Sequence, residues 1–127
     1  MRLAIVAGTV FLATSVQAAP PAKVGSCAQT SIKSIGTRFG DKLVKPRQGD
    51  ADQGTSVVTA NGVYGVSYEF VPAVAASKVG DRVMTCLASV PKGCPKGDDR
   101  GKMYTTTNLR TQESWTLPDS QHMCGGA

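Results

Sequence analysis

The stretch that decides the fold is Ser56-Val57-Val58-Thr59-Ala60-Asn61-Gly62-Val63-Tyr64-Gly65-Val66-Ser67-Tyr68-Glu69-Phe70. β-Branched and aromatic residues dominate both sides of Asn61-Gly62, and this dipeptide tolerates the positive φ angles that a two-residue type I′ turn requires. The stretch therefore predicts a β-hairpin. A two-residue turn brings three cross-strand pairs into register, which are Ala60 and Val63, Val58 and Gly65, and Ser56 and Ser67.

The second half of this hairpin alternates in polarity, as a strand with two different faces does. One face holds Tyr64, Val66, Tyr68 and Phe70, joined by Val57 and Thr59, and the other holds Val63, Gly65, Ser67 and Glu69. Such alternation favours the aromatic face as the core. The alternative is that Tyr64 and Tyr68 form an exposed platform on which a ligand ring stacks. No group of lysines and arginines accompanies these tyrosines in the sequence.

Runs rich in β-formers continue on both sides of the hairpin. They predict strands at residues 29–39, 82–90, 102–107 and 113–117, and the segment 71–77, with Pro72 near its start, predicts a short helix. The polar, glycine-rich segments 40–56 and 91–101 are typical of exposed loops. We therefore expect a mainly β domain, a small antiparallel barrel or sandwich of about five strands with one short helix and two disulfides.

The composition limits what this domain does. The chain has 127 residues, of which 41% are hydrophobic, 18% charged and 6% aromatic, and its formal net charge is +5. These values exclude a large multidomain enzyme, a multi-span membrane protein and a coiled coil. The charge is also too low for a strongly basic nucleic-acid-binding tail, which argues against a nucleic-acid partner.

The N-terminus has the pattern of a secretory signal peptide. Arg2 precedes an apolar run at residues 3–13, and the small residues Val16 and Ala18 occupy positions −3 and −1 of a cleavage site. The run is too short to span a bilayer, which needs about twenty residues, and this disfavours the alternative of an uncleaved anchor. We expect a signal peptide at residues 1–18, a flexible leader at 19–26 and one β-rich domain at 27–127 in the periplasm or outside the cell. Removal of Arg2 leaves 13 basic and nine acidic residues, a net charge of +4.

All four cysteines follow the signal peptide, and an even number in a small exported domain predicts two disulfides. The pairing we expect is Cys27 with Cys124 and Cys86 with Cys94. Cys86 and Cys94 are near each other in sequence with Gly93 available for a chain reversal, and domain termini often lie close together. A Cys27–Cys86 link between neighbouring strands is the alternative.

Residues that could carry chemistry are few. His122 follows Asp119 and Ser120, which raises the hypothesis of a small hydrolase, although members of a triad rarely come from one short tail. The motif Asp50-x-Asp52-x-Gly54 resembles part of a calcium loop but lacks the later acidic ligands. We therefore expect no catalytic residue, no metal site and no cofactor.

Basic residues form two loose clusters, at residues 38–47 and 92–102, each interleaved with acidic residues. Such interleaving favours a role in solubility, and binding of an anionic polymer is the alternative. The expected partner is a protein or an anionic component of the cell envelope. The surface residues that we expect to meet it are Tyr64, Tyr68, Lys92, Lys96 and Arg100.

Three segments of the chain are similar to those of small exported proteobacterial proteins without an assigned activity. They are Ser77-Lys-Val-Gly-Asp-Arg-Val, Cys94-Pro-Lys-Gly-Asp-Asp-Arg-Gly and the ending Leu117-Pro-Asp-Ser-Gln-His-Met-Cys-Gly-Gly-Ala. The resemblance spans residues 27–127 and implies an envelope or secreted setting. It transfers no functional residue. The sequence as a whole predicts a non-catalytic exported domain that binds a ligand or supports the envelope.

Overall fold

The computed structural model describes residues 8–12 and 18–126, and the cleavage-site residue Val16 lies outside them. The described chain is mainly β, as predicted. Its elements are β1 (Cys27–Gly36), β2 (Thr55–Thr59), β3 (Tyr64–Ser67), α1 (Pro72–Ala75), β4 (Arg82–Ser89), β5 (Met103–Asn108) and β6 (Ser114–Pro118). Residues 23–26, assigned from sequence to a flexible leader, form a turn in which the Ser26 N–H donates to the Lys23 carbonyl, and the Gly25 N–H donates to the Leu87 carbonyl.

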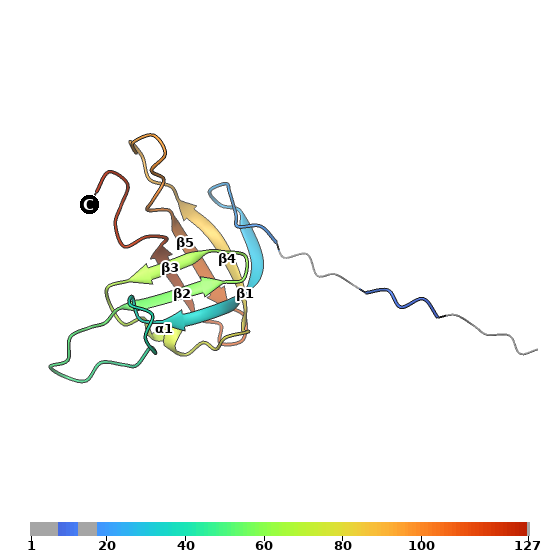
Figure 1. The fold of residues 1–127 in the computed structure, drawn as a ribbon, viewed down its shortest axis with the longest axis horizontal. Helices are drawn as coiled ribbons and strands as arrows, with labels where there is room; N and C mark the ends of the chain where they lie inside the picture. Colours follow the sequence, from blue (N-terminus) through green and yellow to red (C-terminus); the bar gives the residue numbers. More distant parts are fainter. Residues whose placement is uncertain (1–7, 13–17, 127) are drawn as a thin grey trace, which may run out of the picture.

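The six strands form one antiparallel sheet in the order β3-β2-β1-β4-β5-β6. The sheet curls into a half-barrel, which brings the edge strands β3 and β6 close together without a ladder of hydrogen bonds between them (Figure 1). At the closest approach, a Cβ atom added to Gly65 of β3 would lie 3.3 Å from Leu117 of β6 and from Val57. A residue without a side chain at this position therefore lets the two edges meet.

The hairpin forms where the sequence predicts it, but the predicted register is wrong by one residue. Val57 pairs with Gly65 and Val58 with Tyr64, because the turn has three residues between Thr59 and Val63. Gly62 ends this turn with φ of 93°, and the Thr59 hydroxyl bonds to Asn61 and Val63 inside it. A one-residue slip in register changes which side chains of the two strands share a face.

The slip leaves Val57 and Thr59 of β2 in the core, as predicted, but pairs them with the face of the second strand that holds Val63 and Gly65 instead of the face that holds Tyr64 and Tyr68. Val57, Thr59 and Val63 are buried inside the curled sheet, whereas Tyr68 is 51% exposed and Tyr64 is only partly buried. Val66 is the buried member of the aromatic face. The larger of two buried clusters consists of Ile32, Val57, Val74, Val83, Trp115 and Leu117, and the smaller consists of Val63, Leu87 and Tyr104.

The expected disulfide pairing is wrong, and the alternative link is present. Cys27 pairs with Cys86, and Cys94 pairs with Cys124. Cys27 and Cys86 are direct cross-strand partners on β1 and β4, with Cα atoms 4.0 Å apart. Because Cys86 lies within a strand beside β1, the loop carrying Cys94 is left to cross-link the C-terminal tail.

A polar network fastens the helix to the β5–β6 turn. Arg110 forms two hydrogen bonds of 2.8 Å with the Asp81 carboxylate, and fully buried Asn108 donates to Asp81 and to the Ser77 hydroxyl. These hydrogen bonds, led by the one from Arg110, hold the pKa of Asp81 well below its usual range. The network stabilises the end of the half-barrel at which β4 begins.

Candidate functional site

The most developed surface feature is a stack of three side chains, Arg38, Phe39 and Tyr68, hereafter the Arg38 stack. The guanidinium carbon of Arg38 lies 4.4 Å from the centre of the Tyr68 ring and 4.6 Å from that of Phe39. Phe39 is 63% exposed and Tyr68 51%. Contacts at these distances are attractive because the positive charge meets the negative faces of the rings.

Two loops and the end of β3 bring this stack together. Arg38 follows β1, and its backbone N–H donates to the Gln53 carbonyl, which fixes the loop between β1 and β2 beside it. Gly54 then passes so close that an added Cβ atom would collide with the Arg38 Cγ and with the Ser67 carbonyl oxygen. A glycine at position 54 therefore provides the space through which the Arg38 side chain reaches Tyr68.

The C-terminal tail completes the site through Gln121. The Tyr68 hydroxyl donates to the Gln121 carbonyl at 3.1 Å, and Arg38 Nη1 donates to Gln121 Oε1 at 3.3 Å. The tail is held by the Cys94–Cys124 disulfide and by the Asp98 carboxylate, which accepts a 3.0 Å hydrogen bond from the Gly125 N–H. Hydrogen bonds from the Arg100 side chain and from Gly125 keep the pKa of Asp98 well below its usual range.

Beside the stack is an open hollow of about 330 Å³, hereafter the seam hollow, where β3 and β6 end. It is lined by Val66, Ser67, Tyr68, Glu69, Thr116, Leu117, Pro118, Ser120 and Gln121. Tyr68 and Gln121 belong both to this lining and to the contacts of Arg38. A ligand in the hollow would thus touch aromatic, amide and hydroxyl groups next to a guanidinium. Ligand pockets typically have volumes of about 300–1,000 Å³.

Within residues 8–12 and 18–126, no ion pair compensates the charge on Arg38. Among the described residues, the ion pairs are Arg47–Asp50, Arg100–Asp98, Lys102–Asp99 and Arg110–Asp81. Arg38 Nε is buried and has no hydrogen-bond partner. A partly buried arginine normally has a carboxylate beside it, because desolvation of an unpaired charge is costly. The Arg38 stack therefore presents a cationic group whose side chain contacts two aromatic rings and the Gln121 amide.

The residues predicted to form a ligand surface do not lie in one place. Tyr68 belongs to the Arg38 stack, whereas Tyr64 lines a separate hollow with Lys102 and Asp119. In the 92–102 cluster, Arg100 is bound by Asp98 and Lys102 by Asp99, which raises the pKa of both bases. Lys92 and Lys96 are exposed on the same loop. Pairing with internal acids weakens the prediction that this cluster binds an anionic polymer.

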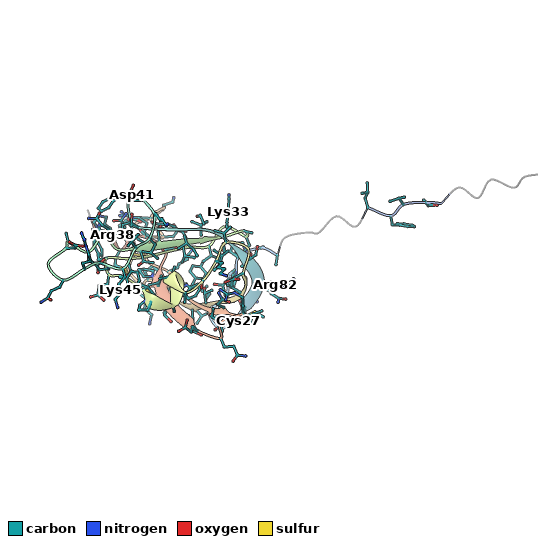
Figure 2. The ribbon with its side chains drawn as sticks, turned by 90° about the horizontal axis from the view of Figure 1, so that it is seen from below. Cys27, Lys33, Arg38, Asp41, Lys45 and Arg82 are labelled. Atoms are coloured by element: carbon teal, nitrogen blue, oxygen red, sulfur yellow. A yellow bond between two sulfur atoms is a disulfide. The ribbon has the colours of Figure 1, made fainter. Side chains whose placement is uncertain are left out.

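Sequence reasoning placed Arg38 only in the basic cluster at residues 38–47, and it missed Phe39 and Gln121 as site residues. The sequence has no group of lysines and arginines beside the tyrosines, but the fold brings one cation there, because Arg38 stacks on Tyr68 from 30 positions earlier in the chain. Figure 2 shows Arg38 and Lys45 at one end of the domain and Cys27 and Arg82 at the other. The adjacent Arg38-Phe39 pair, which begins two residues after the end of β1, is a local signal that could have indicated the site.

The contacts of the described residues do not support the hypothesis of a hydrolase at His122 or that of a calcium loop at residues 50–54. Asp119 Oδ1 accepts the N–H groups of Gly101 and Lys102, and Ser120 accepts the His122 backbone N–H. In the described part of the chain, none of the side-chain hydrogen bonds of these two residues involves the exposed His122 ring. The Asp52 carboxylate caps the Gly54 and Phe70 N–H groups. Within residues 8–12 and 18–126, no group of three or more His, Cys, Asp or Glu could hold a metal ion.

No family model matches the chain, and neither the curated proteins nor the solved structures contain a significant match. In the part of the chain that the structure describes, no helix has the length and apolarity needed to cross a membrane.

Proposed function

We propose that this protein is a non-catalytic, exported binding domain that holds its ligand at the Arg38 stack and the seam hollow. One observation carries the proposal. A guanidinium that has no carboxylate partner among the described residues lies over two rings that are each more than half exposed, beside an open hollow. Exposed aromatic and arginine side chains are the residue types that contribute most to binding at interfaces.

Export is supported by the N-terminal pattern and by the cysteines. All four cysteines are paired in the two disulfides, and disulfides of small domains persist in oxidising compartments. The N-terminus combines Arg2, a short apolar run and small residues before Ala19, which is the composition of a cleaved secretory signal. Together these features favour the periplasm or the extracellular space as the site of binding.

The test compares the wild type with two arginine variants that lose the same charge. Immobilised wild-type protein, Arg38→Gln and Arg82→Gln are incubated with envelope extract, and the retained material is quantified. Arg82 is an exposed control on β4 at the opposite end of the domain (Figure 2). We expect material that the wild type and Arg82→Gln retain and that Arg38→Gln loses. Equal retention by all three proteins would contradict the proposal.

A further inference from the structure

Two side chains of the site, Arg38 and Gln121, have N–H groups that bond to nothing in the fold. Arg38 Nη1 donates to Gln121 Oε1, which holds the guanidinium beside the side-chain amide at the seam hollow. Among the described residues, neither Arg38 Nη2 nor Gln121 Nε2 donates to a protein group, and neither atom is buried, so both face solvent. A guanidinium and an amide placed side by side are complementary to the two oxygens of one carboxylate.

The aromatic rings of the stack each keep a face for a ligand. Arg38 lies over one face of Phe39 and one face of Tyr68. Because both rings are more than half exposed, their opposite faces are open to solvent. The C–H groups on one side of a sugar ring form an apolar face, and the negative face of an aromatic ring attracts them.

The seam hollow combines an apolar floor with a polar rim. Its floor contains the buried side chains of Val66 and Leu117. The hydroxyl and carboxylate groups of the rim come from Ser67, Glu69, Thr116 and Ser120. In the part of the chain that the structure describes, Glu69 bonds only through its backbone, so its exposed carboxylate can accept hydroxyl groups of a ligand.

These surroundings distinguish between classes of carboxylate ligand. A polyanion would meet Glu69 and the three acidic residues that lie among the four basic ones in residues 38–54. A fatty or aromatic acid would bind Arg38 but would bring no hydroxyl donor to Glu69. A sugar with one carboxylate supplies the anionic group, the hydroxyl donors and the apolar face together.

We infer that the ligand is a sugar residue bearing one carboxylate. The carboxylate binds Arg38 Nη2 and Gln121 Nε2, the ring lies against the open face of Tyr68, and the hydroxyl groups reach Glu69 across the seam hollow. This inference rests on the proposed binding function and specifies its ligand. The carboxylate of such a sugar belongs either to a uronic acid or to a lactyl ether on an amino sugar.

The test uses nuclear magnetic resonance of the ¹⁵N-labelled, disulfide-bonded protein with two matched pairs of probes. Methyl β-D-glucuronide and methyl β-D-glucoside differ only in the carboxylate, and N-acetylmuramic acid and N-acetylglucosamine differ only in the lactyl ether. We expect at least one acidic sugar to shift the Gln121 side-chain amide and the Tyr68 backbone amide. Its affinity should exceed that of its neutral counterpart by about tenfold or more, the range for a charge-assisted hydrogen bond.

Three variants and a small anion locate the contact. Arg38→Gln should lose the preference for the acidic sugar, and Arg82→Gln should keep it. Gln121→Glu retains Arg38 but gives it a carboxylate partner inside the protein, so this variant should also lose the preference, even if Arg38→Gln does not fold. Sodium acetate should bind the wild type at least about tenfold more weakly than the acidic sugar, because it makes only the carboxylate contacts.

The outcomes separate this inference from the proposed function. Binding of the glucuronide alone supports a uronic acid, and binding of N-acetylmuramic acid alone supports a lactyl ether. Equal affinity for the acidic and neutral sugars in both pairs, or acetate binding as strong as that of the acidic sugars, would overturn the inferred ligand. If no sugar shifts Tyr68 but the wild type retains envelope material that Arg38→Gln loses, the proposed function stands and the acidic sugar is wrong. If neither occurs, both proposals fail.

Discussion

Gly65→Ala should destabilise the half-barrel because position 65 is where its two edges meet. The added methyl group would lie 3.3 Å from Leu117 Cβ, Leu117 Cδ1 and Val57 Cγ1, closer than ordinary van der Waals contact. Overpacking of this kind costs about 1–3 kcal/mol. Replacing glycine by alanine also restricts the unfolded chain, which offsets about 0.4–1 kcal/mol. We therefore expect a net loss of about 1 kcal/mol in the free energy of unfolding.

Urea unfolding followed by Trp115 fluorescence measures this loss, and Leu117→Val supplies a double-mutant cycle. Leu117→Val alone should cost about 1 kcal/mol, as removal of a buried methylene does. In the double variant the smaller side chain leaves room for the new methyl, so the combined loss should fall short of the sum by about 0.5 kcal/mol or more. Strict additivity, or a Gly65→Ala variant at least as stable as the wild type, would refute the close approach of β3 and β6.

Four other perturbations have defined outcomes. Tyr68→Ala should change the free energy of unfolding by less than about 1.5 kcal/mol, because the ring is half exposed, and a loss above about 3 kcal/mol in urea would place it in the core. Asn108→Ala should cost about 2–3 kcal/mol, since buried Asn108 bonds to Ser77, Asp81, Arg110 and Thr111, and a loss below about 1 kcal/mol would contradict this network. Asp81 has a folded pKa below its unfolded value, so the stability that its carboxylate contributes is complete above about pH 5 and is lost as the pH falls through and below about 4. Tm measured from pH 2 to 7 should therefore decline less steeply for Asp81→Asn than for the wild type. Equal slopes would contradict the pairing of Asp81 with Arg110. The double variant Cys94→Ser/Cys124→Ser should keep the sheet but increase amide exchange at Gly125, whose N–H donates to the Asp98 carboxylate, and unchanged protection would show that the disulfide does not position the tail.

The location of the strands could be predicted because each is a short β-branched run bounded by glycine, proline or polar residues. The helix was equally visible from Pro72 and the alanines that follow it. The register of the hairpin could not be predicted, because Asn61-Gly62 fits both a two-residue and a three-residue turn. Apolar residues occur on both faces, at Val57 and Val58 on one strand, so alternation alone did not select the buried side.

The disulfides and the site depend on pairing between distant segments, which local patterns do not contain. Cys27 meets Cys86 only through the register of β1 with β4, a separation of 59 residues. The Arg38 stack likewise requires the β1–β2 loop, the end of β3 and the tail to meet at one place. Tyr68 was identified as a candidate, but its cation and its hydrogen-bond partner come from elsewhere in the chain.

The most direct measurement of the Arg38 stack is the ¹H–¹⁵N signal of the Arg38 side-chain Nε–H group. A buried Nε between two rings predicts a signal that is resolved from solvent-exposed arginines, protected from exchange and displaced by the ring currents of Phe39 and Tyr68. Tyr68→Ala should move this signal toward the exposed position, and Arg82→Gln should leave it unchanged. An Arg38 Nε–H signal that overlaps with the signals of exposed arginines in the wild type, and that does not move in Tyr68→Ala, would contradict a preformed binding site.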